Sequence, residues 1–376
     1  MAVKGRIRQR GLAASGHRGP GVDKEGNILK TDPFKEYIKQ TEPNKRDKGY
    51  AWQTAIGLQA VDGLRPSEYL IATAINNIEG RIDIDEAQQL LDQYYRENPA
   101  AQENDRTEEA DKVSARIAKL LSEKAFSFTP NQYMAIHKDL FRDIYKHAGQ
   151  IRAYNITKKE WVLDGATVLY GTASELRATL EHDLSQEKSF SYKGLSMDET
   201  IRHLAVFVSR LWQIHVFAEG NTRTTAVFFI KYLRTLGFDV TNDIFAENAW
   251  YFRNALVRAN YNDLKNGIHE TTEFLEMFLR NLLLGEKNEL HNRTMHISGT
   301  FQSVNKGKDV SVKGNEGNVG INVGINVGIK SKKQPLQEKI LLLLNEDGSL
   351  SARALSEMLE VSQRQVERCI AELKKS

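Results

Sequence analysis

Apolar residues recur at steps of three and four positions along most of the chain, which is the spacing of one face of an α-helix. The first periodic stretch, residues 50–97, is interrupted by glycines and predicts a small helical domain over 49–105. Ser67 and Asp85 are the expected helix caps, because their short side chains can accept hydrogen bonds from the free amides of a helix start.

A longer periodic region covers residues 110–288 and predicts a second, larger helical domain. Four of its segments have clear helical spacing: 173–184, 198–216, 222–236 and 248–262. Between 151 and 171 the pattern instead alternates around an Asp-Gly turn, which is typical of a β-hairpin. The expected fold is therefore mainly α, with one hairpin.

The segments outside these domains differ in composition. Residues 1–48 form an expected solvated, disordered arm, because the first 50 positions carry twelve Lys or Arg against six Asp or Glu and little apolar periodicity. Residues 300–334 repeat Asn-Val-Gly-Ile, and the regular glycines break a helix, so a linker is expected there.

Helical spacing returns over residues 335–376, with the turn "EVS" between two short helices, and predicts a helix-turn-helix domain. The last helix offers Gln and Arg side chains, which reach base edges and phosphates. Residues 351–374 are therefore a candidate DNA contact. A domain of the same fold that contacts protein is an equal alternative.

Composition changes this picture little. The chain of 376 residues is too long for one compact core, and its net charge of +3 does not indicate nucleic acid for the whole molecule. The one cysteine, Cys369, excludes an intrachain disulfide, and no apolar run reaches the roughly 20 residues of a membrane span. We expect a cytoplasmic protein with no membrane partner.

The most informative stretch is "QIHVFAEGNTRTTAVFFIKYL", residues 213–233. His215 ends an apolar helix, and the amides from Gly220 onward open the next one, where free amides bind phosphate oxygens. Arg223 can add a forked phosphate contact, and Glu219 suits Mg²⁺ beside it. With His215 as a base, the stretch predicts attack of an alcohol on a metal-bound nucleotide phosphate.

A zinc site is a weaker alternative for the same stretch. His203, His215 and Glu219 are suitable ligand types, but His203 lies twelve residues before His215 and a further ligand is not evident.

The stretch "HVFAEGNTR" resembles the signature of the Fic (filamentation induced by cAMP) domain family, written H-x-F-x-[DE]-[GA]-N-[GK]-R-x-x-R. The similarity extends over about 110–288, where 151–171 resembles the family's substrate-holding flap. The resemblance implies a Fic-type helical bundle with a β-hairpin flap. It also implies a protein adenylyltransferase that moves AMP from ATP, with Mg²⁺, to a Ser, Thr or Tyr hydroxyl of a target protein.

The resemblance also implies a role for each matching position. His215 resembles the general base, Phe217 the core anchor and Glu219 the Mg²⁺ ligand. The positions expected to bind the nucleotide are Gly220, Asn221 (α-phosphate), Thr222, Arg223 (β-phosphate) and, on the adenine side, Tyr251 and Asn260. The flap positions expected to pair with an extended target segment are Thr167, Val168 and Leu169.

The chain departs from the family signature at two positions. Thr222 stands where Gly or Lys is usual, a mild change because its backbone N–H remains. Ala226 replaces the second arginine, which in the family contacts the γ-phosphate and pairs with an inhibitory glutamate.

The domain over 49–105 resembles the small antitoxin domains that inhibit Fic toxins. Asp62 stands in the place of the inhibitory glutamate and Leu58 in the place of a Ser or Thr, while Glu79 is an alternative acid. Because Asp62 is shorter and Ala226 is uncharged, the family's inhibitory pair cannot form in the usual way. Weak restraint is expected, so that deletion of residues 1–105 changes activity little.

Two other functions stay open. One is a DNA-binding regulator with a degenerate Fic domain, which the loss of an arginine at Ala226 favours. The other is a Fic transferase that uses a different nucleotide donor, since no residue that reads the base can be fixed from the sequence.

Overall fold

The computed structural model describes residues 34, 37, 43–98, 106–240, 244–298, 340, 351–352, 355–356 and 363–373. The expected linker over 300–334 lies outside the described residues, as do most of the expected arm and most of the C-terminal domain.

Helices make up most of the described chain. The α-helices are α2 (Pro43–Gly57), α3 (Glu68–Ile78), α4 (Ile84–Glu97), α5 (Thr107–Ser122), α6 (Pro130–Phe141), α7 (Leu176–Ser189), α8 (Met197–Ile214), α9 (Asn221–Thr235), α10 (Ile244–Arg258), α11 (Glu273–Leu284) and α14 (Gln363–Leu373). The 3-10 helices are η1 (Leu58–Asp62), η3 (Trp161–Leu163), η4 (Leu264–Asn266) and η5 (Asn292–Met295). The mainly α prediction is confirmed.

Helix starts follow the capping chemistry of the sequence, with one correction. Ser67 caps α3 as predicted, because its side chain accepts a hydrogen bond from the amide of Leu70. Asp85 was the wrong choice for α4: Asp83 accepts from the amide of Glu86, whose side chain accepts from the Asp83 amide in return. Similarly, α2 begins at Pro43, so the last part of the expected disordered arm is helical.

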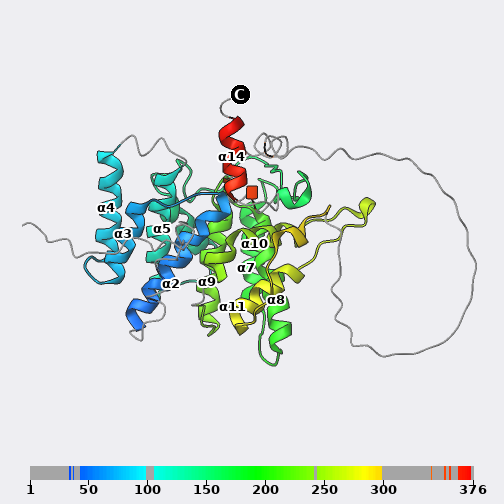
Figure 1. Ribbon diagram of the computed structural model, residues 1–376. Coiled ribbons are helices and arrows are strands. Elements are labelled where there is room, and N and C mark those ends of the chain that lie inside the picture. The colour runs from blue at the N-terminus through cyan, green and yellow to red at the C-terminus, as the bar shows by residue number, and fades with distance from the viewer. Residues whose placement is uncertain are drawn as a thin grey trace, which may run out of the picture.

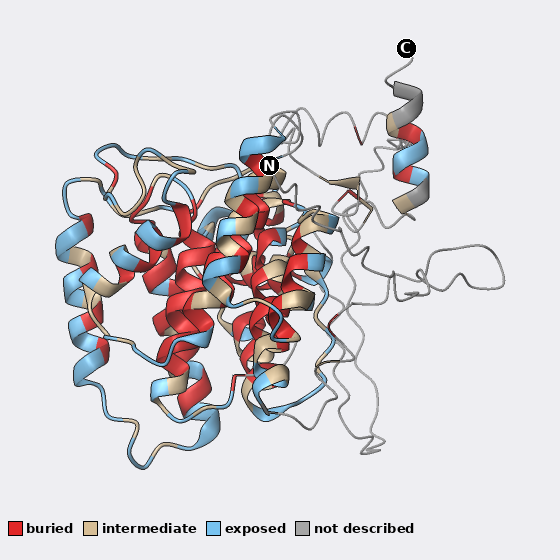
Figure 2. Ribbon diagram, turned by 90° about the vertical axis from the view of Figure 1, so that its left-hand side faces the viewer, coloured by how far each residue is buried: buried red, intermediate tan, exposed pale blue. Residues whose placement is uncertain are grey.

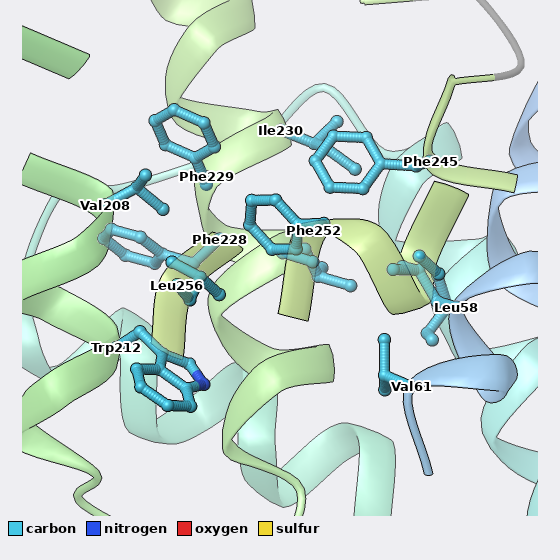
Figure 3. Packing of buried hydrophobic residues seen from close by; sticks show 14 of the residues in the cluster. Leu58, Val61, Val208, Trp212, Phe228, Phe229, Ile230, Phe245, Phe252 and Leu256 are labelled. Carbon is cyan, nitrogen blue, oxygen red and sulfur yellow. The ribbon is translucent and has the colours of Figure 1, made fainter. Parts of the chain in front are cut away.

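The helices of the two predicted domains lie side by side. In Figure 1, α2 to α5 form one side of the molecule and α7, α8, α10 and α11 the other, while α9 runs between them. Buried positions line the facing sides of these helices (Figure 2). Leu58 and Val61 of η1 pack near Phe252 of α10 within one core that also holds Phe228 of α9 (Figure 3). The two domains thus share a single hydrophobic core.

The segment 151–171 does not form the expected β-hairpin, since it contains no strand. The Glu160 amide does donate to the Ala166 carbonyl at 2.9 Å across the turn. However, η3 occupies the position of the first arm directly before Asp164 and Gly165, which both adopt positive φ. We keep the name flap for this segment.

Helix α9 is the element that positions the central stretch. Its residues Asn221–Leu233 are all buried, so the core surrounds it and fixes where its first turn lies. No helix in the described part of the chain is long and apolar enough to cross a membrane.

Candidate active site

The loop between α8 and α9 is held by a buried arginine. His215 ends α8 in the left-handed conformation, with φ of 51°, which turns the chain out of the helix. The Nε of Arg152 donates to the His215 carbonyl at 2.8 Å, and the Arg152 amide donates to the Val216 carbonyl at 3.0 Å. These bonds fix the backbone on which the imidazole is mounted.

The imidazole of His215 is buried and makes no hydrogen bond to the described residues. It is 4% exposed, its ring centroid lies 4.3 Å from that of Tyr170, and neither ring nitrogen has a hydrogen-bond partner among the described residues. Burial, with the nearby charges of Lys158 and Arg253, keeps the pKa of His215 well below its usual value. The ring is therefore neutral at pH 7 and has a lone pair available for a proton.

The carboxylate of Glu219, two residues before the start of α9, is 53% exposed. The Nζ of Lys158, on the flap, lies 3.4 Å from its Oε2. Glu219 is thus an accessible oxygen ligand beside the start of α9, paired with a cation.

A buried histidine from α6 supports the backbone at Glu219. The Gly149 amide donates to the Nδ1 of His137 at 2.8 Å, so the proton sits on Nε2, which donates to the Glu219 carbonyl at 3.0 Å. The His137 ring also stacks on Phe217 at 3.7 Å between centroids. Burial lowers the pKa of His137 to about 3, which keeps the ring neutral in this role.

Gly220 is required at the start of α9 for two reasons. Its φ is 75°, a conformation that side chains disfavour, and an added Cβ would lie 2.4 Å from the ring of Phe141. No side chain in the described part of the chain caps α9. Its first amides are therefore available to an anion.

Asn221 and Thr222 point inward. The Asn221 amide accepts from the Phe217 N–H at 2.9 Å and donates to the Phe217 carbonyl at 2.7 Å, which ties the loop to α9. Thr222 Oγ1 accepts from Trp212 Nε1 at 3.0 Å. In this arrangement both side chains brace the loop, and the contribution of Thr222 to an anion is its backbone N–H.

Arg223 is completely buried, at 0% exposed. Its Nη1 donates to Gln59 at 3.0 Å, and its Nη2 lies 2.7 Å from Glu109 and 2.7 Å from Asp62. The guanidinium carbon also lies 4.8 Å from the ring centroid of Phe141. The arginine expected at the β-phosphate is therefore occupied by acids and an amide from η1 and α5.

Asp62 is one of these acids, and its side chain is 28% exposed. Burial raises its pKa, but the charges of Arg223, Arg253 and Lys158 outweigh burial and hold the pKa below the usual value. Asp62 is thus ionised at neutral pH. The family's pair at position 226 is absent as expected, yet Asp62 does form an ion pair, with Arg223.

The two adenine-side candidates lie on or after α10. Tyr251 is 1% exposed, and its hydroxyl has no hydrogen-bond partner within the described ranges. The Nδ2 of Asn260 donates to the carbonyls of Ser209 and Leu256 at 3.1 Å and 2.8 Å. Asn260 therefore links α8 to α10, and its role toward adenine stays a prediction.

The three flap candidates differ in exposure. Val168 is 2% exposed and anchors the flap, whereas Leu169 is 83% exposed. The Leu169 carbonyl accepts from Gln213 Nε2 at 3.0 Å, and Thr167 Oγ1 accepts from the Lys158 amide at 3.3 Å. Leu169 is thus the one of the three whose side chain is presented to a partner.

The zinc alternative receives no support. His203 does not approach His215 as a co-ligand but pairs through Nε2 with Glu187 at 2.7 Å. The described residues contain no group of three or more His, Cys, Asp or Glu that could hold a metal.

Several residues in or next to the site were not predicted, among them Arg152, His137, Glu109 and Glu160. They lie on other elements than the signature and come near it only in the folded chain. Local spacing in the sequence gives no signal for them, and only the structure shows that each is a charged or polar residue between 0% and 6% exposed.

Comparison with known proteins finds two family matches. Residues 127–233 match the Fic/DOC family, and residues 334–376 match the winged helix-turn-helix DNA-binding family. The predicted Fic-type domain and helix-turn-helix domain are confirmed by these matches.

Two curated relatives are similar to part of the chain. Protein adenylyltransferase VbhT of Bartonella schoenbuchensis is 30% identical over 109 residues, which is 29% of this chain and 21% of that protein. Probable protein adenylyltransferase y4lH of Sinorhizobium fredii is 28% identical over 139 residues, which is 35% of this chain and 65% of that protein. The chain thus spans less than two thirds of the length of each relative.

Proposed function

We propose that this protein is an adenylyltransferase that moves AMP from Mg-ATP to a target protein, because residues 127–233 match the Fic/DOC family. The observation that carries the proposal is the buried, neutral and unpartnered ring of His215 beside the uncapped start of α9. The names of the two relatives support the same class of reaction.

The reaction is an in-line displacement at the α-phosphorus. The oxygen of a Ser, Thr or Tyr hydroxyl bonds to that phosphorus while its bond to the bridging oxygen of pyrophosphate breaks. His215 takes the hydroxyl proton on a ring nitrogen, and pyrophosphate leaves with the electron pair. The amides of α9 from Gly220 onward offset the charge that develops on the α-phosphate.

Glu219 fits the magnesium ion that such a reaction uses. Its carboxylate is half-exposed beside the start of α9, and magnesium is usually held by one or two carboxylates together with phosphate oxygens. When bound, the ion would supply neutralisation of the polyphosphate charge. Glu219 would hold the ion, and the nucleotide would provide the remaining oxygen ligands.

We further propose that Asp62 restrains the enzyme through Arg223. The expected weak restraint rested on the missing charge at Ala226, but the Asp62–Arg223 pair does not need that charge. With Glu109, it holds the guanidinium away from a nucleotide. The antitoxin-like role of residues 49–105 therefore becomes a stronger hypothesis than the sequence alone supported.

DNA is a second proposed partner. The match of residues 334–376 to a DNA-binding family favours it over a purely protein-binding domain. Binding to duplex DNA that weakens steeply with salt, and is lost after truncation at residue 334, would support this role. A cytoplasmic location and the choice of ATP over other donors stay predictions.

The test is transfer of label to protein. The full chain is incubated with lysate and each α-labelled nucleoside triphosphate in turn. We expect label from ATP with the wild type and none with His215→Ala, while His182→Ala, an exposed histidine on α7, behaves as wild type. Label retained by His215→Ala would refute the assigned base, and label from another triphosphate would change the donor.

A further inference from the structure

The proposed nucleotide site has little free positive charge from the signature residues. A triphosphate needs several positive contacts, yet Arg223 is occupied by Asp62 and Glu109, and position 226 is an alanine. While Arg223 is held by these acids, positive charge for the phosphates has to come from side chains outside the signature.

Three other cations lie near enough to lower the pKa of His215, and two of them already have hydrogen-bond or ion-pair partners. Arg152 donates to the backbone carbonyls of His215 and Gly171. Arg253 lies 2.8 Å from the carboxylate of Glu160, which is 0% exposed, so this pair is part of the interior. The remaining cation is Lys158.

Lys158 is more exposed than these arginines and is held by a weaker ion pair. Its side chain is 31% exposed, and its ion pair with Glu219 is 3.4 Å long at a half-exposed carboxylate. Such a pair contributes little to stability and can be exchanged for another anion. The lysine side chain is long and flexible, so its ammonium can move from a carboxylate to a nearby phosphate.

The backbone that carries Lys158 is nevertheless fixed. Two positions further on, Glu160 is bound by Arg253 of α10 and by the hydroxyl of Tyr170 at 2.9 Å. The ring of Tyr170 in turn packs on His215. A buried ion pair therefore anchors the flap beside the base, and Lys158 extends from that anchor toward Glu219.

We propose that Lys158 is a phosphate-binding residue, which supplies from the flap the positive charge that Arg223 and Ala226 do not. This inference rests on the proposed function. Before the nucleotide binds, the ammonium neutralises Glu219. When Mg-ATP is bound, Glu219 would hold the magnesium ion, and the ammonium of Lys158, released from this carboxylate, would contact phosphate oxygens as a point charge.

The experiment is a pair of binding titrations on the full chain with magnesium present, one with ATP and one with adenosine. Lys158→Met removes the charge, and Lys158→Arg keeps it. The matched control is Lys159→Met, because the neighbouring lysine is exposed. We expect Lys158→Met to weaken ATP binding about tenfold, as for loss of one charged contact, and to leave adenosine binding unchanged. Lys158→Arg and Lys159→Met should both bind ATP as the wild type does.

Two results would overturn the inference while the proposed function stands: ATP bound equally well by Lys158→Met, or ATP and adenosine weakened by the same factor. The second result would mean that Lys158 only supports the flap. A wild type that binds neither ligand and transfers no label would overturn the proposed function itself, and the inference with it.

Discussion

The Nη2 atom of Arg223 lies 2.7 Å from the carboxylate of Asp62 and 2.7 Å from that of Glu109. These acids come from η1 and α5, outside the signature stretch that contains the arginine. Removing one partner of a buried ion pair is costly, so the arginine is held firmly only while both acids remain charged. The relationship connects the first helices of the chain directly to the start of α9.

Asp62→Asn should therefore increase transfer of label. It keeps the size of the side chain but removes the charge, which weakens the hold on Arg223 and lets the guanidinium turn toward the nucleotide. We expect an increase of about tenfold, the effect of roughly 1.4 kcal/mol on the barrier. The measurement is the initial rate of label transfer at saturating ATP.

The control for this variant is Asp85→Asn, which removes a carboxylate from a surface pair with Lys119. It should leave the rate unchanged. An unchanged rate in Asp62→Asn as well would mean that the Asp62–Arg223 pair serves only the fold. Deletion of residues 1–105 is a less informative test, because it also removes Leu58 and Val61 from the shared core.

His137 should make stability depend on pH. Its pKa is about 3 in the folded chain and near 6.5 when unfolded, so the unfolded chain binds the extra proton between these values. Stability from this residue is complete above pH 6.5 and is lost as pH falls toward 3, by about 1.4 kcal/mol per pH unit. His137→Gln should reduce this slope in denaturant titrations at pH 5 to 7. His182→Gln, at an exposed position, should keep the wild-type slope.

The helices could be predicted from the sequence because they depend on the local spacing of apolar residues. The four segments expected between 173 and 262 correspond to α7, α8, α9 and α10 with small shifts at their ends. The predicted hairpin is not found: Asp164 and Gly165 do form a turn, but η3 takes the place of one arm. Alternation in a short stretch does not distinguish paired strands from a loop whose side chains are alternately buried.

Residues of the candidate site could be predicted from the sequence only where they are neighbours along the chain. His215 ends α8 with a buried ring, Glu219 has a half-exposed carboxylate and Gly220 directly precedes α9, while their roles in binding and catalysis stay predictions. The surroundings of Arg223 could not be predicted, since Glu109 and Gln59 reach it from 114 and 164 positions away. A carboxylate that far along the chain has no local pattern that links it to an arginine.

The transfer rate should be insensitive to pH around neutrality. The active form of His215 is the neutral ring, and burial lowers its pKa, so this form persists to lower pH than in an ordinary histidine. We expect kcat/KM to be constant from about pH 6 to pH 8 and to fall only on further acidification. The profile is measured with label transfer in buffers of equal ionic strength. An acid limb centred near 6.5 would contradict the buried, unpartnered state of the ring.

Gly220→Ala should disrupt the start of α9 through a steric clash, and a second variant separates this clash from backbone strain. The substitution adds both the strain of a positive φ and a contact of 2.4 Å with Phe141. Gly237→Ala, after the end of α9, adds strain at φ of 89° with nothing within 4 Å of the new Cβ. Strain alone costs about 1–2 kcal/mol, and an overpacked contact adds about 1–3 kcal/mol.

Thermal unfolding should therefore show a clearly larger loss of Tm for Gly220→Ala. Only that variant should also lose ATP binding, because only its Cβ displaces the amides that face the phosphates. Equal losses in the two variants would mean that Phe141 yields to the methyl group and that the close approach at Gly220 does not constrain the site.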